Sequence, residues 1–274
     1  MNALELVVVL LAGLVAGVIN TIVGAGSLIT FPLLVGVGVP PLTANVSNTV
    51  GLVPAAVTGA WGYRHELTGT WRVVVRMAVL SSVGAVAGAA LVLVASPDAF
   101  TLVVPWLLVV AAVLAAAQPR IAERIRRREA LAALASGTSL ADDDAAPAEV
   151  VARVTRPLSV GLALGIAATG VYGGYFGAAQ GVILLAMLGT WWSADLHRAN
   201  GAKVILAGTA NVVGGAIFVA SGEVDWTVAS LIAVGSAIGG VIGARVGRRI
   251  PAPALRVVIV VVGLGAAVGL WIRG

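Results

Sequence analysis

Uncharged polar residues and one lysine interrupt an otherwise apolar chain at a few places. Asn45, Asn48 and Thr49 stand together at the start of one apolar segment, and Asn200 and Lys203 stand at the start of another. Such groups are costly inside apolar segments unless they bind one another or a ligand. Amides and hydroxyls can donate hydrogen bonds to an anion, and a lysine adds positive charge. The pattern predicts a polar site for a small anion within the apolar part of the chain.

Lys203 is the only lysine in the chain and lies inside its segment, after Arg198. We weigh three roles for it: attraction of an anionic substrate, release of a proton coupled to transport, or an ammonium that extends to the membrane surface from an apolar stem. Asn211 lies two helical turns further along the same segment. It either lines the site or bonds a neighbouring helix.

Two Gly-rich stretches, 20–27 and 172–181, interrupt apolar runs. Glycine permits a tight backbone path, and free N–H groups at the start of the following helix can hold an anion. The alternative is that these glycines only allow helices to cross closely. The candidate binding residues in the two stretches are Asn20, Thr21, Gly24, Gly26, Ser27, Tyr175, Gln180 and Gly181.

Residues for other chemistries are missing from the sequence. There is no cysteine, and the two histidines, His65 and His197, have no carboxylate cluster near them. No Ser-His-Asp arrangement, no paired carboxylates within an apolar segment and no phosphate loop with a lysine occur. We therefore expect no enzyme, no metal, no cofactor and no ATP-driven pump.

The composition is that of a membrane protein. Of the 274 residues, 59% are hydrophobic and 11% are charged, whereas a soluble domain has about 25% charged residues. The net charge of +5 reflects arginines that act as topology signals rather than a nucleic-acid-binding surface. We predict an all-α, multi-pass protein of the bacterial inner membrane with the lipid bilayer as its surroundings. Homo-oligomerisation is left open.

Apolar runs and one polar stretch divide the chain into three parts. Residues 1–117 and 158–274 form two transmembrane units, and residues 118–157 form a cytoplasmic loop, helical in its first half, that contains Asp142, Asp143 and Asp144. Runs near 27–39 and 181–192 are short, and the sequence leaves open whether they cross the membrane or form re-entrant hairpins. The longer runs lie near 4–22, 46–63, 71–95, 99–117, 158–175, 200–220, 226–247 and 252–272.

The two units resemble each other at a shift of 155 residues, which pairs Asn45 with Asn200 and Trp71 with Trp226. Matching loops have opposite charge: basic residues follow the third segment of the first unit, and acidic residues follow that of the second. Because cytoplasmic loops attract Lys and Arg, we predict two inverted repeats of about five segments each, with broken or re-entrant short helices. Both termini would lie outside. Inverted repeats with broken helices are typical of transporters that bind substrate near the bilayer midplane.

At these residues the chain resembles the sulfite exporter TauE/SafE family. The resemblance rests on the ordered motifs 24–27, 44–49, 177–181, 199–203 and 218–222, with Pro32 and Asn211. It implies alternating-access export of sulfite, sulfoacetate or another organosulfonate. Ser27, Ala178, Gln180 and Ala202 depart from the family pattern within the expected site, so the substrate of this chain can differ from sulfite. The alternatives are a carrier of another small organic anion such as a carboxylate, an anion channel on the same scaffold, and a membrane enzyme or assembly factor.

Overall fold

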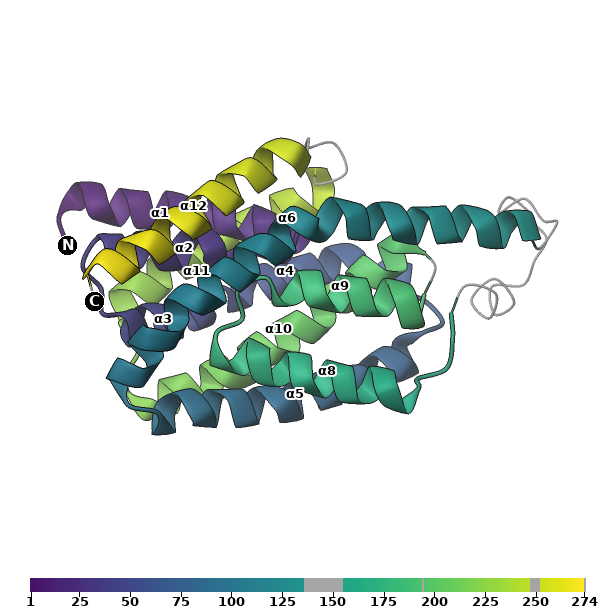
Figure 1. Ribbon diagram of the computed structural model, residues 1–274, viewed down its shortest axis with the longest axis horizontal. Helices are drawn as coiled ribbons and strands as arrows, with labels where there is room; N and C mark the ends of the chain where they lie inside the picture. The colour runs from purple at the N-terminus through teal and green to yellow at the C-terminus, as the bar shows by residue number, and fades with distance from the viewer. Residues whose placement is uncertain (136–154, 194, 247–251, 274) are drawn as a thin grey trace.

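The computed structural model describes residues 1–135, 155–193, 195–246 and 252–273, and in these ranges it contains helices and no β-strand of more than one residue. Figure 1 shows them as a bundle with both chain termini at one end. The helices are α1 (Ala3–Ile22), α2 (Ser27–Gly36), α3 (Pro41–Gly51), α4 (Val53–Tyr63), η1 (Arg64–Leu67), α5 (Trp71–Val94), α6 (Pro97–Ala135), α8 (Val160–Tyr175), α9 (Gln180–Trp191), α10 (Leu196–Ser221), α11 (Trp226–Val246) and α12 (Ala252–Arg273).

Two helical hairpins enter the bundle from opposite ends. The chain runs inward along α1 and returns along α2, and α8 and α9 do the same from the end away from the termini (Figure 1). The turns fall at the two predicted Gly-rich stretches. Left-handed residues form both turns: Gly24 with φ +85° in the first, and Gly177 with φ 71° and Ala179 with φ 60° in the second. Gly24 and Ala179 are 155 residues apart, as the sequence shift requires.

The tips of the two hairpins touch. The N–H of Gly181 donates a hydrogen bond of 3.2 Å to the carbonyl of Gly24. A Cβ on Gly24 would lie 2.5 Å from the Gly181 Cα, and one on Gly181 would lie 2.6 Å from the Gly24 Cα. Only glycine on both sides allows the backbones this approach.

Helices of one half pack mainly against helices of the other half. α1 packs most extensively against α11, and α5 packs most extensively against α8. Three glycines spaced by four on α11, Gly235, Gly239 and Gly243, lie in the first of these contacts, where a Cβ on Gly239 would lie 2.0 Å from the Leu14 carbonyl oxygen. Small residues give the close backbone approach that stabilises helix pairs in lipid.

Equivalent hydrogen bonds join the halves. The Ser81 hydroxyl donates to the Leu206 carbonyl at 3.0 Å, and the Ser236 hydroxyl donates to the Gly51 carbonyl at 2.7 Å. At the shift of 155 residues Ser81 corresponds to Ser236, and Gly51 corresponds to Leu206. The two bonds are therefore equivalent, with the donor in the first half in one and in the second half in the other. These bonds agree with an internal repeat, and its inverted placement in a membrane stays a prediction.

Within the described ranges, five helices are long and apolar enough to cross a membrane: α1, α5, the Pro97–Arg128 part of α6, α10, and the Trp226–Arg245 part of α11. Shorter apolar helices include Ser27–Gly36, Val160–Tyr175, Gln180–Trp191 and Ile259–Ile272. The short helices belong chiefly to the hairpins. The prediction of an all-α polytopic membrane protein is confirmed.

Two features differ from simple spans. The run 46–63 is not one helix, because α3 and α4 meet at Leu52, and Pro54 lies in the first turn of α4, where a proline without an N–H is tolerated. By contrast, α6 continues without interruption past residue 117 to Ala135, so the basic first half of the predicted loop is the end of a long helix. Asp142, Asp143 and Asp144 lie outside the described residues.

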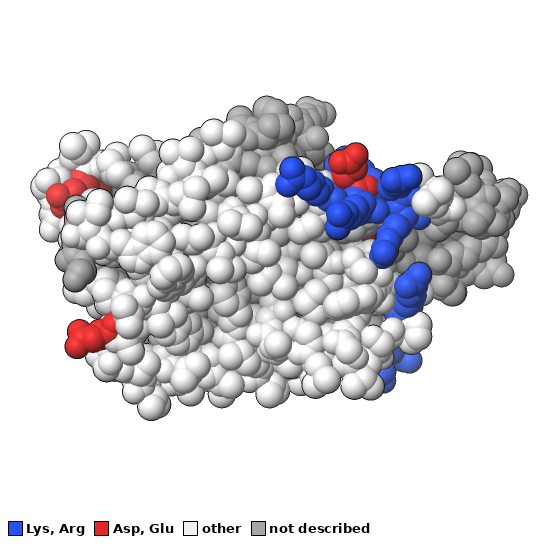
Figure 2. Space-filling view, viewed as in Figure 1, with Lys and Arg blue, Asp and Glu red and all other residues white. Residues whose placement is uncertain are grey.

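Basic side chains on the visible face gather at one end of the bundle. Arginines, with an acidic group among them, cover the end away from the termini, around the extension of α6, and the end that holds the termini shows only acidic side chains (Figure 2). The face between these two ends is uncharged. This arrangement is typical of a protein whose apolar middle lies in a bilayer.

Candidate substrate site

A hydrogen-bonded cluster joins α3 to the start of α2. The Asn48 side-chain amide donates to the Ser27 hydroxyl at 3.0 Å, and its carbonyl oxygen accepts a hydrogen bond from the Thr30 hydroxyl. Ser27 and Thr30 are three residues apart and therefore lie on one face of α2. Asn48 is 1% exposed. Two helices thus place amide and hydroxyl groups together in the interior.

The start of α2 also holds unpaired backbone donors. The first amides of a helix have no partner within the helix, and the N–H groups of Gly26 and Ser27 donate to no protein acceptor within the described part of the chain. They lie at the positive end of the helix dipole. An anion with several oxygens fits such a helix start, since backbone N–H groups and dipole both favour negative charge.

Lys203 lies beside the first hairpin. Its ammonium donates to the carbonyls of Thr21 at 3.2 Å and Ile22 at 3.4 Å, which are the last residues of α1. The side chain is 1% exposed, so it does not extend to the surface in this conformation. The negative end of the α1 dipole compensates part of its charge. Among the described residues no carboxylate pairs with it.

Asn45 forms the corresponding contact with the second hairpin. Its side-chain amide donates to the Tyr175 carbonyl at 2.9 Å, at the C-terminal end of α8. Asn45 and Lys203 thus each bond the last turn of a hairpin's first helix in the opposite half. Polar side chains of α3 and α10 therefore bond the first helix of each hairpin.

Three predicted asparagines have no such partner. Asn20, Asn200 and Asn211 form no hydrogen bond through their side chains to any described residue. Asn20 lies next to the hairpin turn, because a Cβ on Gly26 would lie 3.0 Å from its Cβ. Asn200 precedes Lys203 by three residues and shares its helix face. Their amides are available to a ligand.

The remaining predicted residues have structural contacts. The Thr21 hydroxyl donates to the Gly17 carbonyl and the Thr49 hydroxyl to the Asn45 carbonyl, each within its own helix or segment. The Gln180 amide donates to the Thr169 carbonyl at 3.2 Å within the second hairpin.

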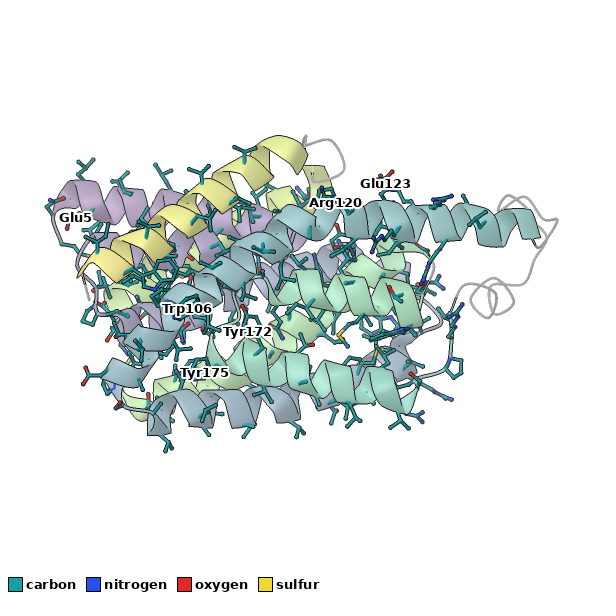
Figure 3. The ribbon with its side chains drawn as sticks, viewed as in Figure 1. Glu5, Trp106, Arg120, Glu123, Tyr172 and Tyr175 are labelled. Atoms are coloured by element: carbon teal, nitrogen blue, oxygen red, sulfur yellow. The ribbon has the colours of Figure 1, made fainter. Side chains whose placement is uncertain are left out.

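Tyr175 contributes its carbonyl to the site region, and its ring lies 5.7 Å from the Phe100 ring. It follows Tyr172 by one turn at the end of α8 (Figure 3). Tyr172 donates through its hydroxyl to the Ala178 carbonyl and closes the turn of the second hairpin.

Sequence reasoning missed Thr30. It is 1% exposed and completes the Asn48 cluster. A signal was present, because a hydroxyl one helical turn after Ser27 in an apolar helix points to a polar partner.

The apolar spans and the buried polar cluster define a multi-pass α-helical membrane protein. Comparison with known proteins gives the particular group: the model of the sulfite exporter TauE/SafE family matches residues 9–270. The chain belongs to this family and is a membrane transporter, not an enzyme.

Two curated relatives have names that agree with this class. A Sinorhizobium protein, "Probable membrane transporter protein ORF9", is 24% identical over 94% of this chain and 89% of its own length. "Probable membrane transporter protein YfcA" from Escherichia coli K12 is 24% identical over 85% of this chain and 77% of its own length. No solved structure matches the chain.

Proposed function

We propose that this protein is a secondary transporter that exports a small sulfur-containing anion, such as sulfite, sulfoacetate or another organosulfonate, by alternating access. The observation that carries the proposal is Lys203, an ammonium buried beside the first hairpin without a carboxylate among the described residues. A buried charge is costly unless it is paired. Two carbonyls use two of its three donors, and an anion supplies the opposite charge.

The first hairpin supports the anion part of the proposal. A sulfonate has three oxygens that each accept hydrogen bonds. The amides of Gly26 and Ser27, the free side chain of Asn20 and the Lys203 ammonium are donors close to one turn of the chain. Asn48 becomes a further donor when it releases the Ser27 hydroxyl.

Burial of the site supports alternating access. Asn48 and Lys203 are each 1% exposed, so a substrate reaches them only after the hairpins or the helices around them move. The inverted repeat gives two equivalent ways to do this, one toward each side of the membrane. By the charge rule, the arginine-rich end faces the cytoplasm of a bacterial inner membrane and both termini face outward.

Calorimetry on the purified protein tests the substrate class, with sulfite, sulfoacetate, taurine, sulfate and small carboxylates as ligands. We expect a sulfonate or sulfite to bind and Lys203→Met, which retains length without charge, to abolish measurable binding. The control is Arg72→Gln, which removes an exposed charge and should bind as the unmodified protein does. Binding of carboxylates alone contradicts the substrate, and normal binding by Lys203→Met contradicts the role of the lysine.

Proteoliposomes distinguish the carrier from the anion channel. Proteoliposomes that contain a carrier and are loaded with unlabelled substrate take up labelled substrate against its gradient, because one site carries unlabelled substrate out and labelled substrate in. A channel shows flux that neither saturates in this way nor gives counterflow. Absence of counterflow with robust anion flux contradicts alternating access.

A further inference from the structure

The extension of α6 forms a basic pocket that the transport function does not use. Six residues line it: Arg124, Ile125, Arg127, Arg128, Leu131 and Thr190. Five come from α6 and one from the end of α9. Arg127 and Arg128 lie three and four residues after Arg124, so the three arginines share one face of α6.

The pocket is held in shape by an apolar contact beneath it. Ile125 is 2% exposed and packs against α9, where a Cβ on Gly189 would lie 2.1 Å from the end of the Ile125 side chain. Arg128 adds a hydrogen bond of 3.3 Å to the Thr190 carbonyl. The arginine face is therefore positioned by a rigid junction of α6 and α9.

Two of the arginines are free to bind a ligand. Arg124 and Arg127 are exposed and form no ion pair or hydrogen bond through their side chains to a described residue. Glu123 precedes Arg127 by four residues and neighbours it on the helix, but the structure forms no ion pair between these two described residues, and the Glu123 side chain projects on the side of α6 away from α9 (Figure 3). Guanidinium groups bind phosphate oxygens in a two-pronged geometry, so the pocket matches a phosphate in charge and donor type.

The position along α6 and the apolar lining favour a lipid over a soluble anion. The apolar part of α6 ends near residue 117, and a span of about 20 residues crosses the hydrocarbon core. Arg124 and Arg127 therefore lie two to three turns further, at the level of the headgroups for a tilted helix. Leu131 is 56% exposed beside them, which is an apolar surface of the kind that an acyl chain covers.

We propose that this pocket binds the phosphate headgroup of an anionic phospholipid from the leaflet that faces the arginine-rich end. The two free arginines hold the phosphate, Arg128 closes the pocket against α9, and Leu131 contacts the acyl chain. Bound lipid would fasten the α6 extension to the membrane surface and to α9. This site is separate from the buried anion site at the first hairpin.

Native mass spectrometry of the purified protein in detergent tests the proposal, with palmitoyl-oleoyl phosphatidylglycerol and palmitoyl-oleoyl phosphatidylcholine added at equal concentration. We expect retained phosphatidylglycerol adducts and few phosphatidylcholine adducts. The double variant Arg124→Gln/Arg127→Gln should bind phosphatidylglycerol more weakly by about fivefold for each arginine removed, which corresponds to about 1 kcal/mol per basic residue near an anionic surface.

A matched control removes basic residues at the same end but outside the pocket. Arg64→Gln/Arg72→Gln makes the same change in net charge and should retain the adducts. Equal loss in both double variants overturns the proposal, because it would reflect general charge. Equal binding of both lipids also overturns it, as does displacement of phosphatidylglycerol by millimolar inorganic phosphate, which would identify a site for a soluble anion.

Discussion

The first hairpin tip presents Ser27, Thr30 and two unpaired amides to Asn48 from α3, whereas the second presents Gln180, whose amide is bound to Thr169 of its own hairpin. Both tips have a left-handed residue at equivalent positions, Gly24 and Ala179, and the second has a further one at Gly177. The chemistry of the tips has therefore diverged on a common backbone. The first tip has donors available for a ligand, and the second is closed by its own side chains.

Equivalent positions on α3 and α10 sharpen this contrast. Asn48 corresponds to Lys203 at the shift of 155 residues. The neutral amide bonds the α2 start of its own half, and the ammonium bonds the α1 end of the other half. Both side chains therefore serve the first hairpin. Two positions related by the sequence shift thus contribute to the same hairpin rather than to one hairpin each.

The contact between the tips can be broken at Gly24. We expect Gly24→Ala to destabilise the protein by about 2–5 kcal/mol, because the left-handed conformation is unfavourable for alanine and its Cβ would overlap the Gly181 backbone. Thermal unfolding in detergent measures the change. The control is Gly36→Ala, where a Cβ meets no atom within 4 Å. Equal melting temperatures for the two variants would show that the tips do not touch.

The polar cluster of the first tip can be broken at Asn48. Asn48→Ala leaves the buried hydroxyl of Thr30 and the half-buried hydroxyl of Ser27 without this partner, and we expect a loss of about 1–3 kcal/mol. Asn211→Ala should cost less than about 0.5 kcal/mol, since the Asn211 side chain has no hydrogen bond to a described residue. Chemical denaturation of both variants measures the difference, and a larger cost at Asn211 would contradict the arrangement of the cluster.

The second tip can be relaxed at Ala179, with the smallest expected effect. Ala179 has φ 60°, the one positive φ outside glycine within the described ranges. Ala179→Gly should stabilise the protein by up to about 1 kcal/mol, because it removes the left-handed strain. The higher entropy of the unfolded chain with glycine offsets part of this gain. Ala178→Gly, next to it without a positive φ, should destabilise. A lower melting temperature for Ala179→Gly than for Ala178→Gly refutes this account.

The sequence predicted much of this arrangement because glycine and buried polar residues have strong local signals. The two Gly-rich breaks, the asparagines of 45–48 and Lys203 were all found from residue type and spacing. The glycines of α11 at 235, 239 and 243 give a signal of the same kind, because small residues spaced by four are typical of a packing face, and they contact α1.

Other features were not predicted, each for a different physical reason. The acceptors of Lys203 are backbone carbonyls of Thr21 and Ile22, and a carbonyl has no side-chain identity to detect. The break at Leu52 did have a signal in Pro54, but an apolar run on both sides concealed it. The continuity of α6 was not expected, because we placed the end of the apolar segment at residue 117. A change from apolar to charged residues does not by itself end a helix.

The pairing of α1 with α11 has a consequence for how the protein is made. A ribosome delivers α1 to the membrane long before α11, so the face of α1 that packs against Gly235 and Gly239 is exposed to lipid until α11 is made. α5 waits likewise for α8. The main packing partners of α1 and α5 are therefore absent until the second half is made, and a truncated chain that stops before α8 would leave both faces open to incorrect helix pairing.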